Sequence, residues 1–295
     1  MPVAGTGEEH GDMESYEHDG LRFDVTESGP PDGPVVIALH GFPATHHSWH
    51  AVTPILTAVG FRVLAPDQRG YSPGARPKGR RAYRLDRLAA DVVALADQAG
   101  AERFHVIGHD WGGAVAWALA DWHAERVLSM TSLATPHPKA MLRSMVRSTQ
   151  LLHSWYMAYF QLPGLPELSF RPPGLRTFRR SLLRSGLSEA DFDIYMELLG
   201  QPGAATGALN WYRALPFTKP STLGPSRVPT LYVYGAADFA LGRYAADLTG
   251  SFVTGRYRYE VLPEAGHWIP ENNAAIVADL FLQHVAGSAD GEGGA

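Results

Sequence analysis

The chain has 295 residues, and its 25 Lys and Arg against 30 Asp and Glu give a formal net charge of −5. A hydrophobic content of 45% is that of a globular protein, so the composition excludes wholesale disorder and fibrous repeats. The mild acidity gives no electrostatic reason to expect binding to nucleic acid or to an anionic membrane surface. The absence of cysteine excludes disulfides, thiolate nucleophiles and Cys-ligated metal sites.

The two ends of the chain are expected to be mobile tails. Residues 1–15 and 287–295 are rich in Gly and acidic residues and poor in large apolar ones, so neither is expected to carry function. The first ten residues lack the basic and apolar regions of a secretory signal, and no run of roughly 18 apolar residues is present to span a membrane. We therefore expect a cytoplasmic protein without membrane insertion, either a monomer or a homodimer.

Between these tails, short apolar runs bounded by turn residues alternate with helical patterns. Strands are predicted at 35–39, 62–65, 105–108, 127–133, 230–234 and 257–262. Several of these runs are apolar on consecutive residues, as in parallel strands that are buried on both faces. Helices are predicted at 85–99, 114–122 and 274–285. This alternation predicts an α/β fold with a mostly parallel central sheet flanked by helices.

One stretch, residues 136–222, breaks the alternation. It contains no convincing strand, but amphipathic arginine-rich pieces, several Pro and Gly, and many aromatic residues. We expect a helical cap here, inserted into a core formed by residues 16–135 and 223–286, with His137 at the hinge. The arginines make the cap locally basic, a pattern that usually marks a solvated helix face.

The most informative motif is Gly-His-Asp-Trp-Gly-Gly at residues 108–113, directly after a predicted strand and directly before a predicted helix. Glycines on either side of the central residue allow a sharp turn that exposes its side chain at the carboxyl edge of the sheet, as in a nucleophile elbow. Here the central residue is Asp110, where Ser is usual, and the helix N-terminus favours its ionised carboxylate. A polar residue that caps a helix after a tight turn would give the same pattern.

One segment before Asp110 in the chain and two after it supply partners for this residue. His-Gly-Phe-Pro follows the first predicted strand, and a backbone N–H there, that of Phe42, can pair with that of Trp111 as an oxyanion hole. Asp238 follows another predicted strand, and His267 lies in a loop just ahead of the last predicted helix. The order nucleophile, acid, His, each at the carboxyl end of a strand, is that of α/β-hydrolases.

From about residue 21 to residue 285 the chain resembles the α/β-hydrolase superfamily, and within it the epoxide hydrolase branch. The segments that match, besides the two motifs above, are Asp-Gln-Arg-Gly-Tyr at 67–71, Asp-Phe at 238–239 and Gly-His-Trp at 266–268. The resemblance implies the α/β-hydrolase fold with a helical cap, catalysis without a cofactor or a metal, and a cis peptide between Phe42 and Pro43.

Two cap segments resemble the tyrosine motifs of that branch. Asn-Trp-Tyr-Arg at 210–213 aligns Tyr212, and the segment at 154–160 aligns Tyr156, with Tyr159 as an alternative to Tyr156. Two phenols above the nucleophile suit epoxide opening, because both can donate to the departing oxygen. For each tyrosine taken singly, packing of an amphipathic helix is the better explanation of the residue.

The resemblance implies that a small apolar epoxide and water are converted to a vicinal diol. Asp110 attacks an epoxide carbon while Tyr156 and Tyr212 donate to the oxygen. A water activated by His267, itself oriented by Asp238, then hydrolyses the resulting ester. The oxyanion of that second step is held by the oxyanion hole described above.

Two alternative functions stay open at this stage. Haloalkane or haloacid dehalogenases use the same Asp nucleophile and expel halide, although Phe42 stands where haloalkane dehalogenases have Asn. A receptor that keeps the fold and the site without catalysis is the other alternative.

The remaining histidines give no metal signal. His46, His47 and His50 form a group without carboxylate spacing, so we expect surface or loop histidines and no metal. His109, beside the proposed nucleophile, is expected to pack within the elbow.

Overall fold

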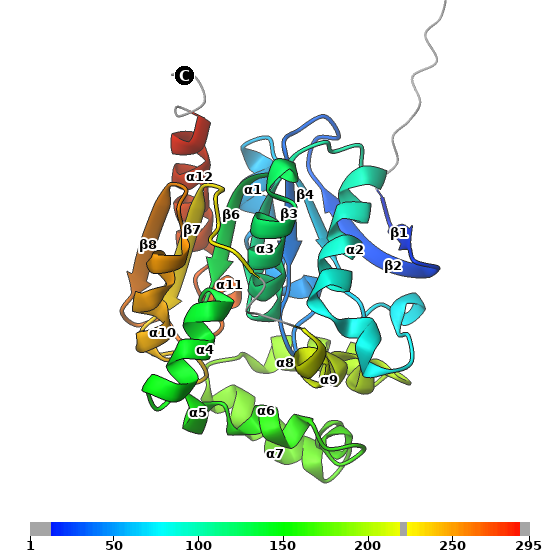
Figure 1. Cartoon of the computed structure of the whole chain (residues 1–295). Helices are drawn as coiled ribbons and strands as arrows, with labels where there is room; N and C mark the ends of the chain where they lie inside the picture. The colour runs from blue at the N-terminus through cyan, green and yellow to red at the C-terminus, as the bar shows by residue number, and fades with distance from the viewer. Residues whose placement is uncertain (1–12, 219–222, 290–295) are drawn as a thin grey trace, which may run out of the picture.

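The computed structural model describes residues 13–218 and 223–289, which form one central sheet with helices on both faces and across one end (Figure 1). The strands are β1 Ser15–His18, β2 Leu21–Ser28, β3 Val35–Leu39, β4 Arg62–Pro66, β5 Phe104–His109, β6 Val127–Leu133, β7 Thr230–Gly235 and β8 Tyr257–Leu262. Their order across the sheet is β1-β2-β4-β3-β5-β6-β7-β8. The pairs β1/β2 and β2/β4 are antiparallel, and every other pair is parallel.

Both faces of the sheet are covered because its central strands are apolar on consecutive residues. In β3, Ile37 and Leu39 belong to one buried cluster, and Val36 and Ala38 belong to another on the opposite face. The flanking helices are α1 Thr53–Ala58, α2 Leu85–Gln98, α3 Trp111–Trp122, α10 Arg243–Leu248, α11 Ile269–Asn272 and α12 Ala274–Ala289. Helices α2 and α3 pack into the first cluster, and α1 and α12 pack into the second. This double cover is the α/β architecture that the sequence predicts.

Six helices between β6 and β7 form a layer across the carboxyl ends of the strands, and we call them the cap helices (Figure 1). They are α4 Pro138–Arg147, α5 Gln150–His153, α6 Trp155–Phe160, α7 Gly174–Arg184, α8 Glu189–Leu199 and α9 Ala204–Ala214. His137 joins the two ends of this insertion, because its ring Nε2 lies 3.2 Å from the backbone oxygen of Gly224. Among the described helices, none is long and apolar enough to cross a membrane.

The six strands and three helices predicted from the sequence are all present, with ends that differ by a few residues. The sequence analysis missed β1 and β2, and it placed Ser15, the first residue of β1, in the amino-terminal tail. These two antiparallel strands at one end of the sheet are only half buried: in β2, Phe23 and Val25 alternate with exposed residues, which gives a weaker signal than a continuous apolar run. At the other end, α12 continues to Ala289, into the predicted tail. The rest of both predicted tails lies outside the described residues.

A buried ion pair holds the loop on which α9 of the cap packs. Arg69, in the loop after β4, donates from Nε and from a terminal nitrogen to the two carboxylate oxygens of Asp91 on α2, at 2.8 and 2.7 Å. The backbone oxygen of Arg69 in turn accepts a hydrogen bond from Trp211 Nε1 at 2.7 Å. At the next residue the loop and α9 are in close backbone contact: a Cβ on Gly70 would lie 2.7 Å from the backbone of Gly207. The Arg69–Asp91 pair thus fixes the loop against which α9, the helix that carries Tyr212, is packed.

We expect Asp91→Asn to lower the free energy of unfolding by about 3–5 kcal/mol, because it leaves the buried Arg69 guanidinium without its carboxylate. The matched control on the same helix is Asp86→Asn, which removes the exposed partner of Arg84 and is expected to cost less than about 1 kcal/mol. Urea unfolding measures both. Equal effects of the two substitutions would contradict the structural role of the Arg69–Asp91 pair.

Candidate active site

The turn between β5 and α3 projects Asp110 at the carboxyl edge of the sheet. Its backbone angles, φ 49° and ψ −119°, lie where residues with a side chain are rarely found. Such a turn requires close backbone contacts: a Cβ on Gly108 would lie 2.3 Å from the oxygen of Gly112, and one on Gly41 would lie 2.3 Å from Asp110 Cβ. The geometry is that of the elbow expected from the motif.

Asp110, His267 and Asp238 come together from three strand ends. The Nδ1 of His267 lies 2.9 Å from an oxygen of Asp238, and its Nε2 lies 3.8 Å from Oδ2 of Asp110. The second distance is too long for a direct hydrogen bond. Asp238 is held in turn by the backbone N–H groups of Ala240 and Leu241, at 2.7 and 3.0 Å. The predicted nucleophile, acid and histidine are therefore neighbours.

Burial and neighbouring charges have opposite effects on the pKa values of Asp110 and His267. Burial raises the pKa of the Asp110 carboxyl, whereas the charge of His267 and the N–H groups of Phe42 and Trp111 lower it. Burial alone would lower the pKa of His267, but the Asp238 and Asp110 carboxylates outweigh it and raise the pKa to about 9. The free protein at neutral pH thus holds a protonated His267 between the side chains of Asp238 and Asp110. On balance burial holds the pKa of Asp110 above its usual value, and the hydrogen bonds and the charge of His267 oppose this rise.

The backbone N–H groups of Phe42 and Trp111 both face the Asp110 carboxylate. Phe42 donates to Oδ1 at 2.8 Å, and the N–H of Trp111 also hydrogen-bonds to this carboxylate. The peptide between Phe42 and Pro43 is cis, as the resemblance implied. The N–H of Phe42 thus holds Oδ1, while Oδ2 faces His267.

The two predicted cap tyrosines lie beside each other near Asp110. The ring of Tyr212 is 6.1 Å from that of Tyr156 and 5.2 Å from that of Phe42, measured between centroids. Burial, followed by the nearby charge of Asp110, raises the pKa of both phenols. Both hydroxyls therefore stay protonated and are available as hydrogen-bond donors.

Tyr159, the alternative to Tyr156, has different surroundings. Its hydroxyl lies 3.3 Å from the backbone oxygen of Leu165 and 3.4 Å from the hydroxyl of Ser169. Both partners belong to the cap. The hydroxyl of Tyr159 therefore bonds within the cap and not toward Asp110.

His109 was expected only to pack within the elbow, but it also bonds to the histidine of the site. Its Nε2 lies 2.8 Å from the backbone oxygen of His267. Burial lowers the pKa of His109 to about 3, so its ring is neutral and Nε2 carries the proton. The neutral ring thus anchors the loop that presents His267. The only sequence signal for this contact was the position of His109 next to Asp110.

A second contact that the sequence analysis missed ties the cap to α11, which follows His267. Tyr195 on α8 donates to Glu271 at 2.7 Å, and Trp268 Nε1 donates to the hydroxyl of Ser185 at 3.0 Å. Burial raises the pKa of Glu271 to about 7, with the hydrogen bond from Tyr195 acting in the opposite direction. The segment after His267 is therefore fixed by the cap as well as by the core.

Among the described residues, His47, His50 and Asp191 form one group whose ligand atoms lie within 4.8 Å of one another. The two imidazole rings are stacked, 4.3 Å apart and 5° from parallel, so their nitrogen lone pairs do not converge on one point. His46 instead lies 3.0 Å from Asp67. This arrangement is a stacked pair at the cap boundary, not a preformed metal site.

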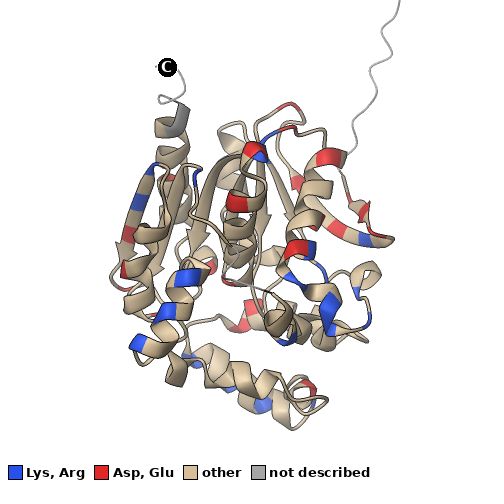
Figure 2. Ribbon diagram, viewed as in Figure 1, with Lys and Arg blue, Asp and Glu red and all other residues tan. Residues whose placement is uncertain are grey.

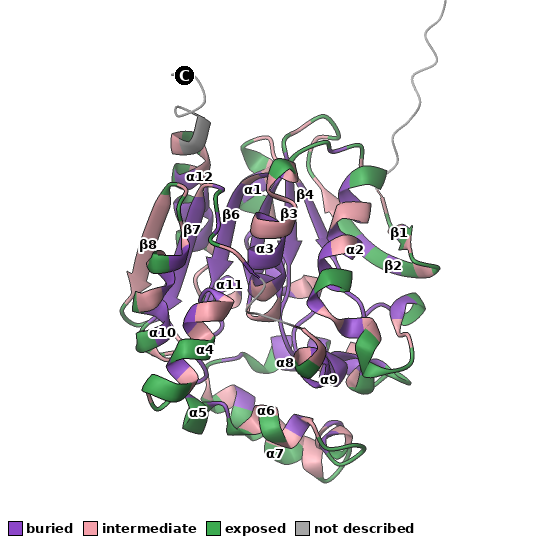
Figure 3. Cartoon of the chain, in the orientation of Figure 1, coloured by how far each residue is buried: buried purple, intermediate pink, exposed green. Residues whose placement is uncertain are grey.

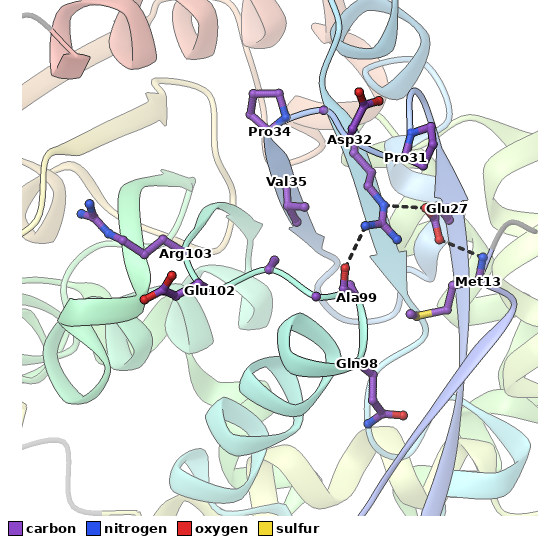
Figure 4. Close-up of a pocket in the computed structure, with 14 residues that line it drawn as sticks. Met13, Glu27, Pro31, Asp32, Pro34, Val35, Gln98, Ala99, Glu102 and Arg103 are labelled. Atoms are coloured by element: carbon purple, nitrogen blue, oxygen red, sulfur yellow. Dashed lines mark hydrogen bonds and ion pairs between the residues drawn. The ribbon is translucent and has the colours of Figure 1, made fainter. Parts of the chain in front are cut away.

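A pocket of about 860 Å³ lies at the opposite edge of the sheet, near the amino ends of β3 and β4 (Figure 4). One ion pair lies within its wall: Arg62 binds Glu27 and, at 2.8 Å, the backbone oxygen of Ala99. Because the site residues lie at the carboxyl ends of the strands, this pocket is separate from them.

Residues 34–274 match a family model described as the alpha/beta hydrolase fold. The chain is 38% identical to the AB hydrolase superfamily protein YfhM of Bacillus subtilis, over 90% of this chain and 95% of that protein. It is 34% identical to epoxide hydrolase A of Mycobacterium tuberculosis, over 91% of this chain and 95% of that protein.

Solved structures agree with these relationships. Epoxide hydrolase A from Mycobacterium thermoresistibile superposes with a TM-score of 0.79 at 29% identity, covering 92% of this chain and 97% of that one. An epoxide hydrolase of the same superfamily from hot-environment metagenomes gives a TM-score of 0.82 at 29% identity, covering 92% and 98% of the two chains.

We expect Asp110→Asn to lower the pKa of His267 from about 9, because it removes one of the carboxylates that stabilise the imidazolium. The imidazolium should then lose its proton at a lower pH. NMR titration of ¹⁵N-labelled imidazole nitrogens measures this shift. Asp193→Asn, an exposed carboxylate on α8, is the control. A His267 titration that is identical in all three proteins would contradict the proposed charge coupling.

Proposed function

The chain belongs to the epoxide hydrolase branch of the α/β-hydrolase superfamily, and from this premise we propose that it converts an epoxide to a vicinal diol through a covalent ester on Asp110. The observation that carries the proposal is the pairing of a carboxylate nucleophile with two protonated phenols, Tyr156 and Tyr212. Relatives named epoxide hydrolase support the reaction class. The substrate that fits is a small apolar epoxide, since aromatic rings surround the carboxylate.

In the first step, Oδ2 of Asp110 attacks one carbon of the epoxide and the carbon–oxygen bond breaks. Oδ1 stays on the N–H of Phe42, which fixes the carboxylate in one orientation. The departing oxygen takes a proton from the phenol pair, because an unprotonated alkoxide is a poor leaving group. The product of this step is an alkyl ester with a free hydroxyl. The contacts of Tyr159 with Leu165 and Ser169 support Tyr156 as the partner of Tyr212.

In the second step, His267 removes a proton from water, which attacks the ester carbonyl carbon. Esterification removes the negative charge of Asp110, so one of the groups that raise the pKa of His267 disappears. The imidazolium can then give up its proton, which restores the phenol deprotonated in the first step, and the neutral ring serves as the base while Asp238 holds its orientation. The oxyanion formed on Asp110 accepts hydrogen bonds from the backbone N–H groups of Phe42 and Trp111. Collapse of this intermediate releases the diol and restores Asp110.

The dehalogenase alternative has less support in the surroundings of Asp110. A departing halide needs N–H donors at the place where the leaving group sits. The Trp111 side chain is engaged with the Tyr212 hydroxyl, and Phe42 offers no side-chain donor. Phenols suit an oxygen leaving group, which must be protonated as it departs.

We expect His267→Gln to stop turnover after the first step, because it removes the base for ester hydrolysis while Asp110 and both phenols remain. Mixing this variant with styrene oxide should add the mass of the epoxide to the peptide that contains Asp110, as measured by mass spectrometry. His153→Gln, on the exposed α5, should turn over like the wild type without an adduct. Absence of the adduct in a folded His267→Gln variant would contradict the covalent mechanism.

Tyr156→Phe and Tyr212→Phe should each slow ester formation roughly a hundredfold to a thousandfold, because each removes one preorganised donor to the developing alkoxide. Tyr159→Phe is the matched control and should be close to the wild type, since its hydroxyl bonds elsewhere. Stopped-flow measurement of tryptophan fluorescence follows the ester-forming step. Full activity of both phenylalanine variants, or faster release of halide from organohalides than opening of epoxides, would favour the dehalogenase alternative.

A further inference from the structure

The outer part of the cap has a charge opposite to that of the rest of the chain. Residues 138–185, from α4 to α7, contain eight of the 25 Lys and Arg but only one of the 30 Asp and Glu. That single acid, Glu167, is bound by Arg213 at 2.7 Å. Figure 2 shows basic residues along α4 and on the outer cap helices, with few acidic residues among them. The overall charge of −5 therefore conceals a strongly cationic segment.

Most of these cations are exposed and have no acidic partner. Besides Arg143, whose guanidinium lies over the ring of Phe252, this described segment has five exposed arginines that take part in no ion pair: Arg147, Arg171, Arg176, Arg180 and Arg184. Arg179, by contrast, binds Glu189 and Asp193 at 3.2 and 3.0 Å. A face that is merely solvated usually carries interspersed charges of both signs. The segment lacks the acids that would balance its arginines.

The same segment carries the most exposed large apolar side chains among the described residues. Val146 is 82% exposed, Leu152 73%, Trp155 68% and Leu151 64%. They lie within ten residues of one another, on the end of α4, on α5 and at the start of α6, where Figure 3 shows exposed ribbon. Contiguous exposed apolar groups of this kind mark an interaction surface.

We propose that these five arginines and four apolar side chains form a docking surface for anionic lipid, here named the cap outer face. Arginine guanidinium groups bind lipid phosphates, and they are drawn to the negative potential of an anionic bilayer. The exposed apolar side chains of the same segment enter the boundary between headgroups and acyl chains, where tryptophan is favoured. The docking is peripheral, because no described helix is able to span the membrane.

Charge also decides between a lipid surface and a second copy of the chain. A two-fold interface places the same face of each subunit against the other, so the unpaired arginines of both copies would meet and repel. An anionic bilayer instead offers phosphates to the arginines and an apolar layer to Val146, Leu151, Leu152 and Trp155. The segregated charge is thus the reason to set aside the expectation, drawn from net charge, that the protein has no affinity for anionic membranes.

Docking in this orientation would bring the site close to the lipid. Trp155 on α6 is exposed, whereas the adjacent Tyr156 turns inward and packs near Tyr212. One short helix therefore connects the cap outer face with the phenol pair, and apolar epoxides concentrate in lipid. This consequence alone rests on the proposed function; the docking itself does not.

Cosedimentation of the full chain with vesicles tests the proposal. We expect binding to vesicles of equal parts phosphatidylcholine and phosphatidylglycerol, little binding to phosphatidylcholine alone, and release at high salt. Arg176→Glu with Arg180→Glu should weaken binding on the order of tenfold or more, and Leu151→Ser with Leu152→Ser should also weaken it. The charge-matched control, Arg22→Glu with Arg227→Glu, changes exposed arginines outside the cap and should bind like the wild type.

Three results would overturn the proposal: no preference for the anionic vesicles, equal binding by the cap and control variants, or ultracentrifugation showing a dimer that the Leu151→Ser, Leu152→Ser variant abolishes. Epoxide turnover in vesicle-free solution is measured in parallel. All variants lie outside the catalytic group, so loss of docking with normal turnover is the expected pattern. Wild-type protein that binds vesicles but opens no epoxide would count against the proposed function and leave the docking intact.

Discussion

A single imidazole ring between two carboxylates is the arrangement on which the site depends. His267 contacts Asp238 through one nitrogen and faces Asp110 through the other. With its side chain only 4% exposed, its charged form is favoured by both acidic side chains, and each of these accepts a hydrogen bond from a backbone N–H as well. Removing one negative charge by ester formation therefore changes the proton affinity of the ring. In the proposed mechanism, the first chemical step itself prepares the base for the second.

Close backbone contacts at the carboxyl edge of the sheet position Asp110, Asp238 and His267. Gly41 and Gly108 leave no room for a Cβ, which lets the elbow and the neighbouring loop converge on Asp110. The loop that presents His267 is fixed from beneath by His109 and from above by contacts between the cap and α11. Because α9 rests on the loop that contains Arg69, the same core that places the nucleophile also places Tyr212.

The sequence predicted those features that rest on local pattern. Continuous apolar runs located the buried strands, and the glycine spacing around Asp110 located the elbow. Long-range contacts left no such trace: the ring of His109 binds a backbone oxygen 158 positions away, and Glu271 meets a tyrosine of the cap. Tyr156 and Tyr159 lie three residues apart on one short helix, so only side-chain contacts distinguish them. Net charge, a sum over the chain, hid the separation of charge in the cap.

The covalent ester on Asp110 is tested most directly by a single turnover in ¹⁸O-labelled water with enzyme in excess over epoxide. If Asp110 is the nucleophile, the new hydroxyl of the diol comes from its unlabelled carboxylate. The first-turnover diol is then free of label, and mass spectrometry finds the label in the Asp110 side chain. A first-turnover diol that contains the label, with Asp110 unlabelled, would mean that water attacks the epoxide directly and would contradict the account.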